Sequence, residues 1–190
     1  MEKAIFLDRD GTINEEMGYI NHISRFHIFP FTFEALKVFK KCGYKLVVIT
    51  NQAGLARGYF SEDVLRDVHG MLEKRARDAG VPLDKIYFCP HLPGAPVKKY
   101  DRMCNCRKPK TGMLEQARDE LNIDLSRSVM IGDRYKDVLF GKKMGLKTVM
   151  VLTGYGKGEY TYQKEQWKEK PDIVADNLLD AAMKICQPKG

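Results

Sequence analysis

Short runs of apolar residues alternate along this chain with longer segments whose apolar residues recur at helical spacing. The runs are short and uninterrupted, which is typical of strands buried on both faces of a parallel sheet. They lie at residues 4–7, 46–49, 86–88, 129–131, 148–152 and 173–175. Helices are expected between them at residues 33–42, 61–79, 112–121, 136–144 and 177–186. This order predicts an α/β fold, a Rossmann-like parallel sheet with helices on both faces.

The chain shows no internal repeat, low-complexity tract or linker, so a single domain over residues 1–190 is expected. Residues 15–32 lack a clear period and are expected to form an ordered loop near the first strand. The segments after the first and second strands are too short for a separate fold, so no large cap domain is expected over the sheet.

Two carboxylates end the first strand, at Asp8 and Asp10, and Gly11 and Thr12 follow them. Ligands bind at the carboxyl ends of strands in parallel sheets. Two acids so close together are costly unless a cation lies between them. On this stretch alone the sequence indicates either an Asp-Gly turn or a magnesium site with a nucleophile.

Other polar residues follow other strands and are expected at the same edge of the sheet. Thr50 and Asn51 end the second strand, and Asp133 follows the fourth and adds a third carboxylate. Oxygen ligands of this kind suit Mg²⁺. Arg107 and Lys108 precede the 112–121 helix, where an anion would be favoured and cations are not. This stretch is either a solvated basic loop or a phosphate site.

The net charge is +7, with an isoelectric point near 9.1, which favours anionic ligands such as phosphates or nucleic acid. The basic residues are dispersed, so nucleic acid is not favoured as a partner. No apolar run is long enough to cross a membrane, and the N-terminus does not resemble a signal peptide. A cytoplasmic location is therefore expected.

Three of the five cysteines, with one histidine, have the composition of a tetrahedral zinc site. These residues are Cys89, His91, Cys104 and Cys106. Four protein ligands leave no open position, so a structural zinc that staples loop 89–106 is expected. The alternative is buried, reduced cysteines beside a satisfied histidine. His69, like the two remaining histidines, has no comparable partner and is expected to be a surface or packing residue.

Four motifs in this order resemble those of the haloacid dehalogenase superfamily, whose members are mostly Mg²⁺-dependent phosphatases. They are Asp8-x-Asp10-Gly11-Thr12, Thr50-Asn51, Lys108 and Gly132-Asp133-x-x-x-Asp137. The resemblance implies that Asp8 is the nucleophile and that Asp10 is the general acid and base. Thr50 and Lys108 would hold the phosphoryl oxygens.

The same resemblance implies that Mg²⁺ is held by Asp8, by the backbone carbonyl of Asp10 and by Asp133. Asp137 would orient neighbours such as Lys108 rather than bind the metal.

Longer stretches resemble one family of that superfamily, the D-glycero-D-manno-heptose 1,7-bisphosphate 7-phosphatases of lipopolysaccharide and surface-glycan biosynthesis. The matching stretches are 6–14, 18–19, 48–60, 87–91 and 104–109. Twelve residues separate His91 from Cys104, which favours this family over the histidinol-phosphate phosphatases, whose loop is shorter. The resemblance implies a substrate pocket formed by Gly18, Tyr19, Asn51, Gln52, Arg57, Arg107 and Arg134.

Two positions depart from that family. Residues 30–32 read Pro-Phe-Thr where Pro-Gly is usual, and Arg134 stands where Lys is common. Neither touches the expected catalytic residues.

The anomer of the sugar is left open, and a monomer is expected. The alternatives are a histidinol-phosphate phosphatase, a zinc-stapled nucleic-acid-binding module and a polynucleotide end-phosphatase.

Overall fold

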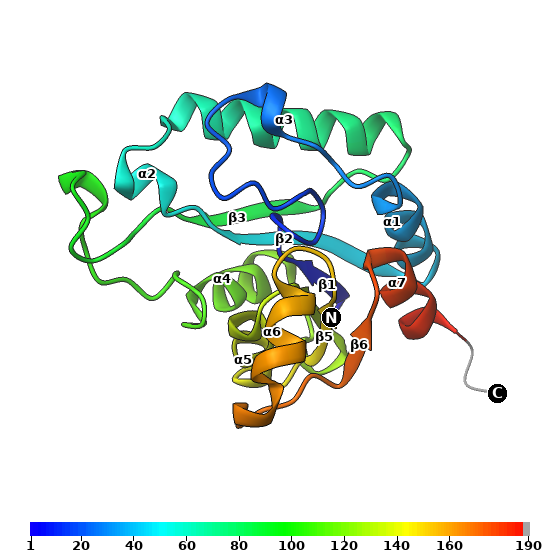
Figure 1. Ribbon diagram of the computed structural model, residues 1–190. Helices are drawn as coiled ribbons and strands as arrows, with labels where there is room; N and C mark the ends of the chain where they lie inside the picture. The colour runs from blue at the N-terminus through cyan, green and yellow to red at the C-terminus, as the bar shows by residue number, and fades with distance from the viewer. Residues whose placement is uncertain (188–190) are drawn as a thin grey trace.

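Six parallel strands form one sheet in the computed structural model, which describes residues 1–187 (Figure 1). The last three residues of the predicted domain, 188–190, lie outside the described residues. The strands are β1 (Lys3–Leu7), β2 (Tyr44–Asn51), β3 (Lys85–Cys89), β4 (Val129–Gly132), β5 (Lys147–Val151) and β6 (Ile173–Ala175). Their order across the sheet is β3-β2-β1-β4-β5-β6.

Helices cover both faces of the sheet, as the alternation of runs predicted (Figure 1). They are α1 (Thr32–Lys41), α2 (Gly54–Arg57), α3 (Glu62–Asp78), α4 (Gly112–Leu121), α5 (Tyr135–Lys142), α6 (Gly156–Gln163) and α7 (Leu178–Cys186). Four short 3-10 turns lie at Ile23–Arg25, Lys98–Tyr100, Leu125–Arg127 and Lys164–Gln166.

Alternate residues of β1 point to opposite faces of the sheet, which follows from the period of two along a strand. Ile5 and Leu7 pack in the core beneath α1, α3 and α7. Ala4 and Phe6 pack in the core beneath α4 and α5. All four are fully buried, so β1 is the central strand of the molecule.

The boundaries of the main helices follow from local chemistry. The Ser61 hydroxyl accepts a hydrogen bond from the Val64 amide and caps α3. Asn177 accepts from the Leu179 and Asp180 amides and caps α7 in the same way. Gly80 follows α3 with a φ of +75°, a conformation that suits glycine at the end of a helix.

The predicted strands and helices are present, with boundaries that move by one or two residues. Two helices were missed: α2 has only four residues, and α6 begins in the glycine-rich segment that followed the fifth strand. Within residues 1–187 no large cap covers the sheet, because the segments after β1 and β2 form loops and the helices α2 and α3. None of the described helices is long and apolar enough to cross a bilayer.

From β1 to β3 successive strands are added on one side of β1, and from β4 to β6 they are added on the other side. The direction of winding therefore reverses between β1 and β4, at the centre of the sheet. A crevice forms at the carboxyl ends of the strands on either side of such a point. Asp8 follows β1 and Asp133 follows β4, so the fold carries these two carboxylates to that crevice.

Candidate active site

A cavity of about 200 Å³ opens at the carboxyl ends of the central strands. Asp8, Asp10, Thr50 and Asp133 all lie on its wall. The other residues that line it are Glu16, Gly18, Tyr19, Asn51, Ala53, Arg107, Arg134, Lys136 and Tyr155. The structure therefore brings residues from three strand ends, distant in sequence, into one polar cavity.

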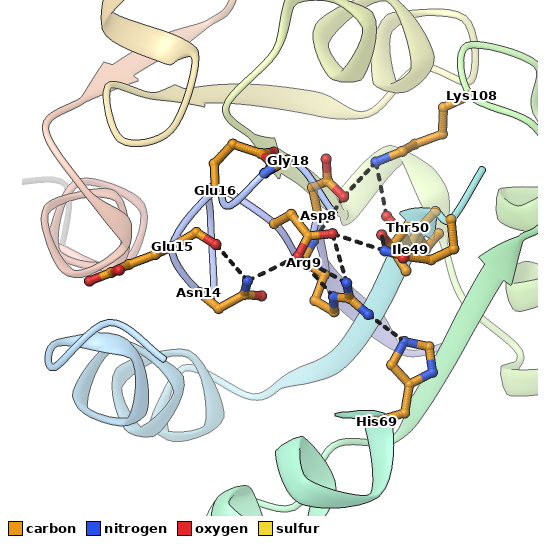
Figure 2. A network of polar contacts seen from close by, with 12 residues as sticks. Asp8, Arg9, Asn14, Glu15, Glu16, Gly18, Ile49, Thr50, His69 and Lys108 are labelled. Carbon is orange, nitrogen blue, oxygen red and sulfur yellow. Dashed lines mark hydrogen bonds and ion pairs between the residues drawn. The ribbon is translucent and has the colours of Figure 1, made fainter. Parts of the chain in front are cut away.

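Asp8, on the wall of this cavity, forms a buried ion pair with Lys108, which is not among the residues that line the cavity (Figure 2). Lys108 Nζ lies 3.0 Å from Asp8 Oδ1 and 2.7 Å from Asp137 Oδ1. It also donates to the Ile49 carbonyl at 2.9 Å. Burial alone would lower the pKa of Lys108, but Asp137 and Asp8 raise it, so the lysine stays charged. The contact between Asp137 and Lys108 expected from the sequence is present.

Two hydrogen bonds from Asn51 fix the backbone of Lys108. The Asn51 carboxamide accepts from the Lys108 amide at 3.0 Å and donates to the Lys108 carbonyl at 3.2 Å. Lys108 comes from the segment before α4, whereas Asn51 ends β2. The amide thus holds an irregular segment against a rigid strand end and places the lysine over Asp8.

Four donor groups surround the carboxylate of Asp10. Arg9 Nη2 lies 2.9 Å and 2.8 Å from its two oxygens, and Arg9 Nε lies 3.2 Å from Oδ1. The Asn14 and Gln52 amides each donate at 2.9 Å. Burial alone would raise the pKa of Asp10, but Arg9 and the two amides outweigh it, and the net pKa is lowered. In this arrangement Asp10 is an ionised carboxylate.

Two glycines make room for Asp133 in the crevice between β1 and β4. A Cβ on Gly11 would lie 2.2 Å from Asp133 Oδ2, and one on Gly154 would lie 2.3 Å from the same atom. Gly11 also has a φ of +79°, which L residues rarely adopt. The Tyr155 amide donates to Oδ2 at 2.9 Å, whereas buried Oδ1 has no hydrogen-bond partner within the described residues.

The donor set around Asp133 fits a divalent cation. Carboxylate oxygens of Asp8, Asp133 and Asp137 lie within 4.8 Å of one another, and all three residues are buried. Burial, and then Asp8 and Asp137, raise the pKa of Asp133 well above its usual value. A bound cation would relieve the repulsion between these carboxylates and would give the unpaired Asp133 Oδ1 a partner. Lys108 and the Arg134 amide occupy both oxygens of Asp137, whereas the printed contacts of the Asp8 carboxylate within the described residues use Oδ1 alone. Asp8 and Asp133 are therefore the carboxylates available to Mg²⁺.

A second cluster, of sulfur and nitrogen, lies next to the cavity and fits zinc. The ligand atoms of Cys89, His91, Cys104 and Cys106 lie within 4.8 Å of one another. Zn–S bonds of about 2.3 Å in a tetrahedron place two sulfurs about 3.8 Å apart. Cys89 Sγ lies 3.6 Å from Cys104 Sγ, and Cys106 Sγ lies 3.3 Å from His91 Nδ1. Cys89 and Cys106 are closer, at 2.9 Å, and all five cysteines are free thiols.

The zinc-ligand loop reaches the cavity through Arg107, which follows Cys106 directly. Arg107 Nη1 donates to the His91 carbonyl at 3.3 Å. The side chain is half-buried and lines the cavity. The orientation of Arg107 therefore depends on the same loop that carries the four candidate ligands.

The residues expected to contact substrate divide into two groups. Five of them line the cavity, namely Gly18, Tyr19, Asn51, Arg107 and Arg134. Gln52 and Arg57 do not. Gln52 is buried and donates to Asp10 and Thr50 at 2.9 Å each, while Arg57 is exposed at the end of α2.

Arg134 is held rigidly at the mouth of the cavity. Its Nε donates to Glu159 Oε1 at 2.8 Å, and its guanidinium lies 4.3 Å from the centre of the Tyr155 ring. Glu159 belongs to α6, the helix that the sequence pattern missed. The other departure from the family pattern lies away from the cavity, where the buried Thr32 hydroxyl donates to the Ile13 carbonyl at 2.8 Å.

Several residues of this region were not singled out from the sequence. Arg9 is one: its side chain is buried and is not part of the cavity lining. Glu16, Lys136 and Tyr155 line the cavity itself. The sequence pattern of α5 did not indicate that Lys136 would line the cavity. His69 was expected to be a surface or packing residue, and nothing in the sequence indicated that its Nε2 would lie 3.1 Å from Arg9 Nη1.

Comparisons with known proteins agree with this geometry. Residues 105–181 match the family model described as HAD-hydrolase-like. A curated relative from Pasteurella multocida is 46% identical over 180 residues, covering 92% of this chain and 97% of the relative. Another, from Haemophilus influenzae, is 42% identical with the same coverage. Both are named D-glycero-beta-D-manno-heptose-1,7-bisphosphate 7-phosphatase.

Solved structures give the same result. The D,D-heptose 1,7-bisphosphate phosphatase of B. bronchiseptica, complexed with magnesium and phosphate, superimposes with a TM-score of 0.84 at 28% identity. The match covers 96% of this chain and 97% of that one. With this level of identity over nearly the full length, the chain belongs to the haloacid dehalogenase-like hydrolases, in the family of the heptose bisphosphate phosphatases.

Proposed function

We propose that this protein hydrolyses the C7 phosphate of D-glycero-β-D-manno-heptose 1,7-bisphosphate, in the synthesis of nucleotide-activated heptose. The observation that carries the proposal is the buried pair of Asp8 and Lys108, in which Asp8 lines the same cavity as Thr50 and Asp133. The names of the curated relatives supply the sugar and its β anomer. The chemistry is phosphoric monoester hydrolysis.

In the first step an Asp8 carboxylate oxygen attacks phosphorus and the bond from phosphorus to the sugar oxygen breaks. Asp10, protonated in this step, gives its proton to the leaving oxygen. The products are the sugar hydroxyl, an aspartyl phosphate on Asp8 and an ionised Asp10. Lys108 and Thr50 hold the phosphoryl oxygens, and Mg²⁺ held by Asp8, the Asp10 carbonyl and Asp133 would neutralise charge on them.

In the second step Asp10 takes a proton from water, and the water oxygen attacks phosphorus. The bond to Asp8 breaks, phosphate leaves, and Asp10 is protonated again for the next turnover. The lowered pKa of Asp10 in this structure corresponds to the ionised form that this step requires. Arg9, Asn14 and Gln52 hold the carboxylate in place.

Cations at the cavity mouth are suited to the phosphate that is not cleaved. Arg107, Arg134 and Lys136 line the same cavity as the nucleophile. Two guanidinium groups favour bidentate binding of a second phosphate. Gly18 and Tyr19, on the loop after β1, would contact the sugar between the two phosphates, as would Asn51, which lines the same cavity.

The histidinol-phosphate alternative is not favoured, because the curated relatives at 42–46% identity carry the heptose name. The further proposals are a monomer, a cytoplasmic location, a single domain and no nucleic-acid partner. Arg57, which is exposed at the end of α2 and outside the cavity lining, is also proposed as a substrate contact, on the family resemblance alone.

Steady-state kinetics on both anomers of heptose 1,7-bisphosphate and on histidinol phosphate test the proposal. The β anomer is expected to have the highest kcat/KM, and phosphate is expected to be released from C7 with C1 phosphate retained. Asp8→Asn is the matched inactive control, since it removes the nucleophile with almost no change in shape. A higher kcat/KM for histidinol phosphate would overturn the assignment.

A further inference from the structure

Arg9, between the two catalytic aspartates, is charged and yet almost completely buried, with 2% of its surface exposed. Buried charges of this kind are rare unless paired. Nε and Nη2 of its guanidinium are used by the Asp10 carboxylate. The ring of Phe26 lies 5.9 Å from the guanidinium carbon and offers no acceptor. The remaining nitrogen, Nη1, therefore needs a partner from elsewhere in the fold.

That partner is His69, on a helix sixty residues further along the chain. Its Nε2 lies 3.1 Å from Arg9 Nη1 (Figure 2). A guanidinium can only donate, so Nε2 must accept and the imidazole must be neutral. Burial and the nearby Arg9 charge lower the pKa of His69 to about 3, which agrees with that state. Within residues 1–187, Nη1 has no other hydrogen-bond partner.

His69 reaches Arg9 from α3, on the side of the helix that carries the buried residues Leu65 and Leu72. Its ring packs against the ring of Phe88 on β3, with the centres 5.7 Å apart. It is not among the residues that line the substrate cavity but lines a separate cavity of about 500 Å³ with residues of α3 and β3. His69 is therefore placed to act through Arg9 and not by touching substrate.

We infer that His69 is a positioning residue of the reaction: its Nε2 holds the Arg9 guanidinium, which in turn holds the Asp10 carboxylate that transfers the proton. The inference rests on the proposed function. Without an acceptor at Nε2, Nη1 becomes an unpaired buried donor, which is costly. Arg9 then turns toward another acceptor, and Asp10 loses the paired donors that orient it.

Substitutions at position 69 that keep or remove the acceptor test this directly. His69→Phe keeps the ring and its packing on Phe88 but removes Nε2. We expect its kcat to fall about tenfold, the size expected for losing a hydrogen bond to a charged group, with KM within twofold of wild type. His69→Gln offers an oxygen near the position of Nε2 and is expected to restore kcat to within about threefold. His27→Phe, at an exposed histidine outside the cavity lining, is the control and should match wild type.

Thermal unfolding of the same proteins separates positioning from folding, because the kcat ratio is compared at a temperature where all variants are folded. The inference is overturned if His69→Phe keeps wild-type kcat, if His69→Gln is as slow as His69→Phe, or if the loss lies in KM. The kcat ratios of the variants to wild type are also measured on p-nitrophenyl phosphate, whose hydrolysis still needs Asp10 to take a proton from water. These ratios distinguish a failure of the His69 inference from a wrong assignment of the sugar. Wild-type protein inactive on both substrates would overturn both proposals.

Discussion

Lys108 and Asp8 form an ion pair of 3.0 Å in which neither side chain is more than 8% exposed. The ammonium is also held by Asp137, so its position is fixed from two sides. In the proposed mechanism one group, the Lys108 ammonium, thus neutralises the carboxylate that attacks phosphorus and holds the phosphoryl oxygens. This ion pair links the end of β1 to the segment that carries the candidate zinc ligands.

Replacing Lys108 by Met is expected to reduce kcat/KM by about 10²–10³, the usual loss on removing one group that stabilises transition-state charge. The substitution also leaves Asp8 and Asp137 buried without their cation, which costs about 3–5 kcal/mol when one partner of a buried pair is removed. Kinetics together with urea unfolding measure the two effects. A variant that is destabilised but retains wild-type kcat/KM would show that Lys108 is structural only.

Gly11→Ala is expected to abolish activity and weaken Mg²⁺ binding, because the new Cβ would meet Asp133 Oδ2 at 2.2 Å. The positive φ adds about 1–2 kcal/mol of strain for a residue with a side chain. Gly80→Ala is the matched control, since its φ of +75° imposes similar strain and nothing lies within 4 Å. Calorimetric titration of Mg²⁺ and kcat are compared, and equal losses in both variants would exclude a specific effect on Asp133.

Removal of zinc is expected to unfold loop 89–106 locally and to lower activity even with Mg²⁺ in excess. The reason is that Arg107 and Lys108 follow the candidate ligand Cys106 directly, and structural zinc sites contribute roughly 10 kcal/mol or more to folding. Metal content by mass spectrometry, hydrogen exchange of the loop and kcat are measured on the same sample. Unchanged exchange and kcat in protein shown to be free of zinc would refute the stapling role.

Asp84 gives a pH dependence that does not involve the active site. Burial alone would raise the pKa of Asp84, but Lys40, the Leu46 amide and Lys45 lower it below the ordinary value of 3.8. The carboxylate therefore contributes stability that is fully present above pH 3.8 and is lost as pH falls through the lower folded value. Asp84→Asn should be less stable than wild type at pH 7, and the gap should close on acidification. A gap that is constant down to pH 2 would contradict this.

Most of the fold could be predicted because buried parallel strands are continuous apolar runs, and residues such as Asp8, Thr50 and Asp133 directly follow such runs. The four zinc-ligand candidates were found because residue type and spacing are both informative. α6 was missed because the glycines around Gly156 and Gly158 conceal its start. These parts of the prediction depended on local pattern alone.

Contacts between side chains that tertiary packing brings together could not be predicted from the sequence. The contact between Arg9 and His69 joins residues sixty positions apart, and neither residue type indicates the other. The family resemblance implied that Gln52 contacts substrate, yet its side chain turns inward to Asp10. Alternation along a strand gives the face of the sheet, whereas a residue just past the strand end is no longer bound by that period.

Chemical trapping of the phosphorylated enzyme tests the central claim most directly, which is that Asp8 is the nucleophile toward the C7 phosphate. Wild-type enzyme is mixed with the β anomer of heptose 1,7-bisphosphate and Mg²⁺, quenched with acid during turnover and reduced with borohydride. Peptide mass spectrometry should find homoserine at position 8 and an unmodified residue there in the absence of substrate. Modification at another residue, or turnover by the wild-type enzyme with no modification at Asp8, would contradict the account.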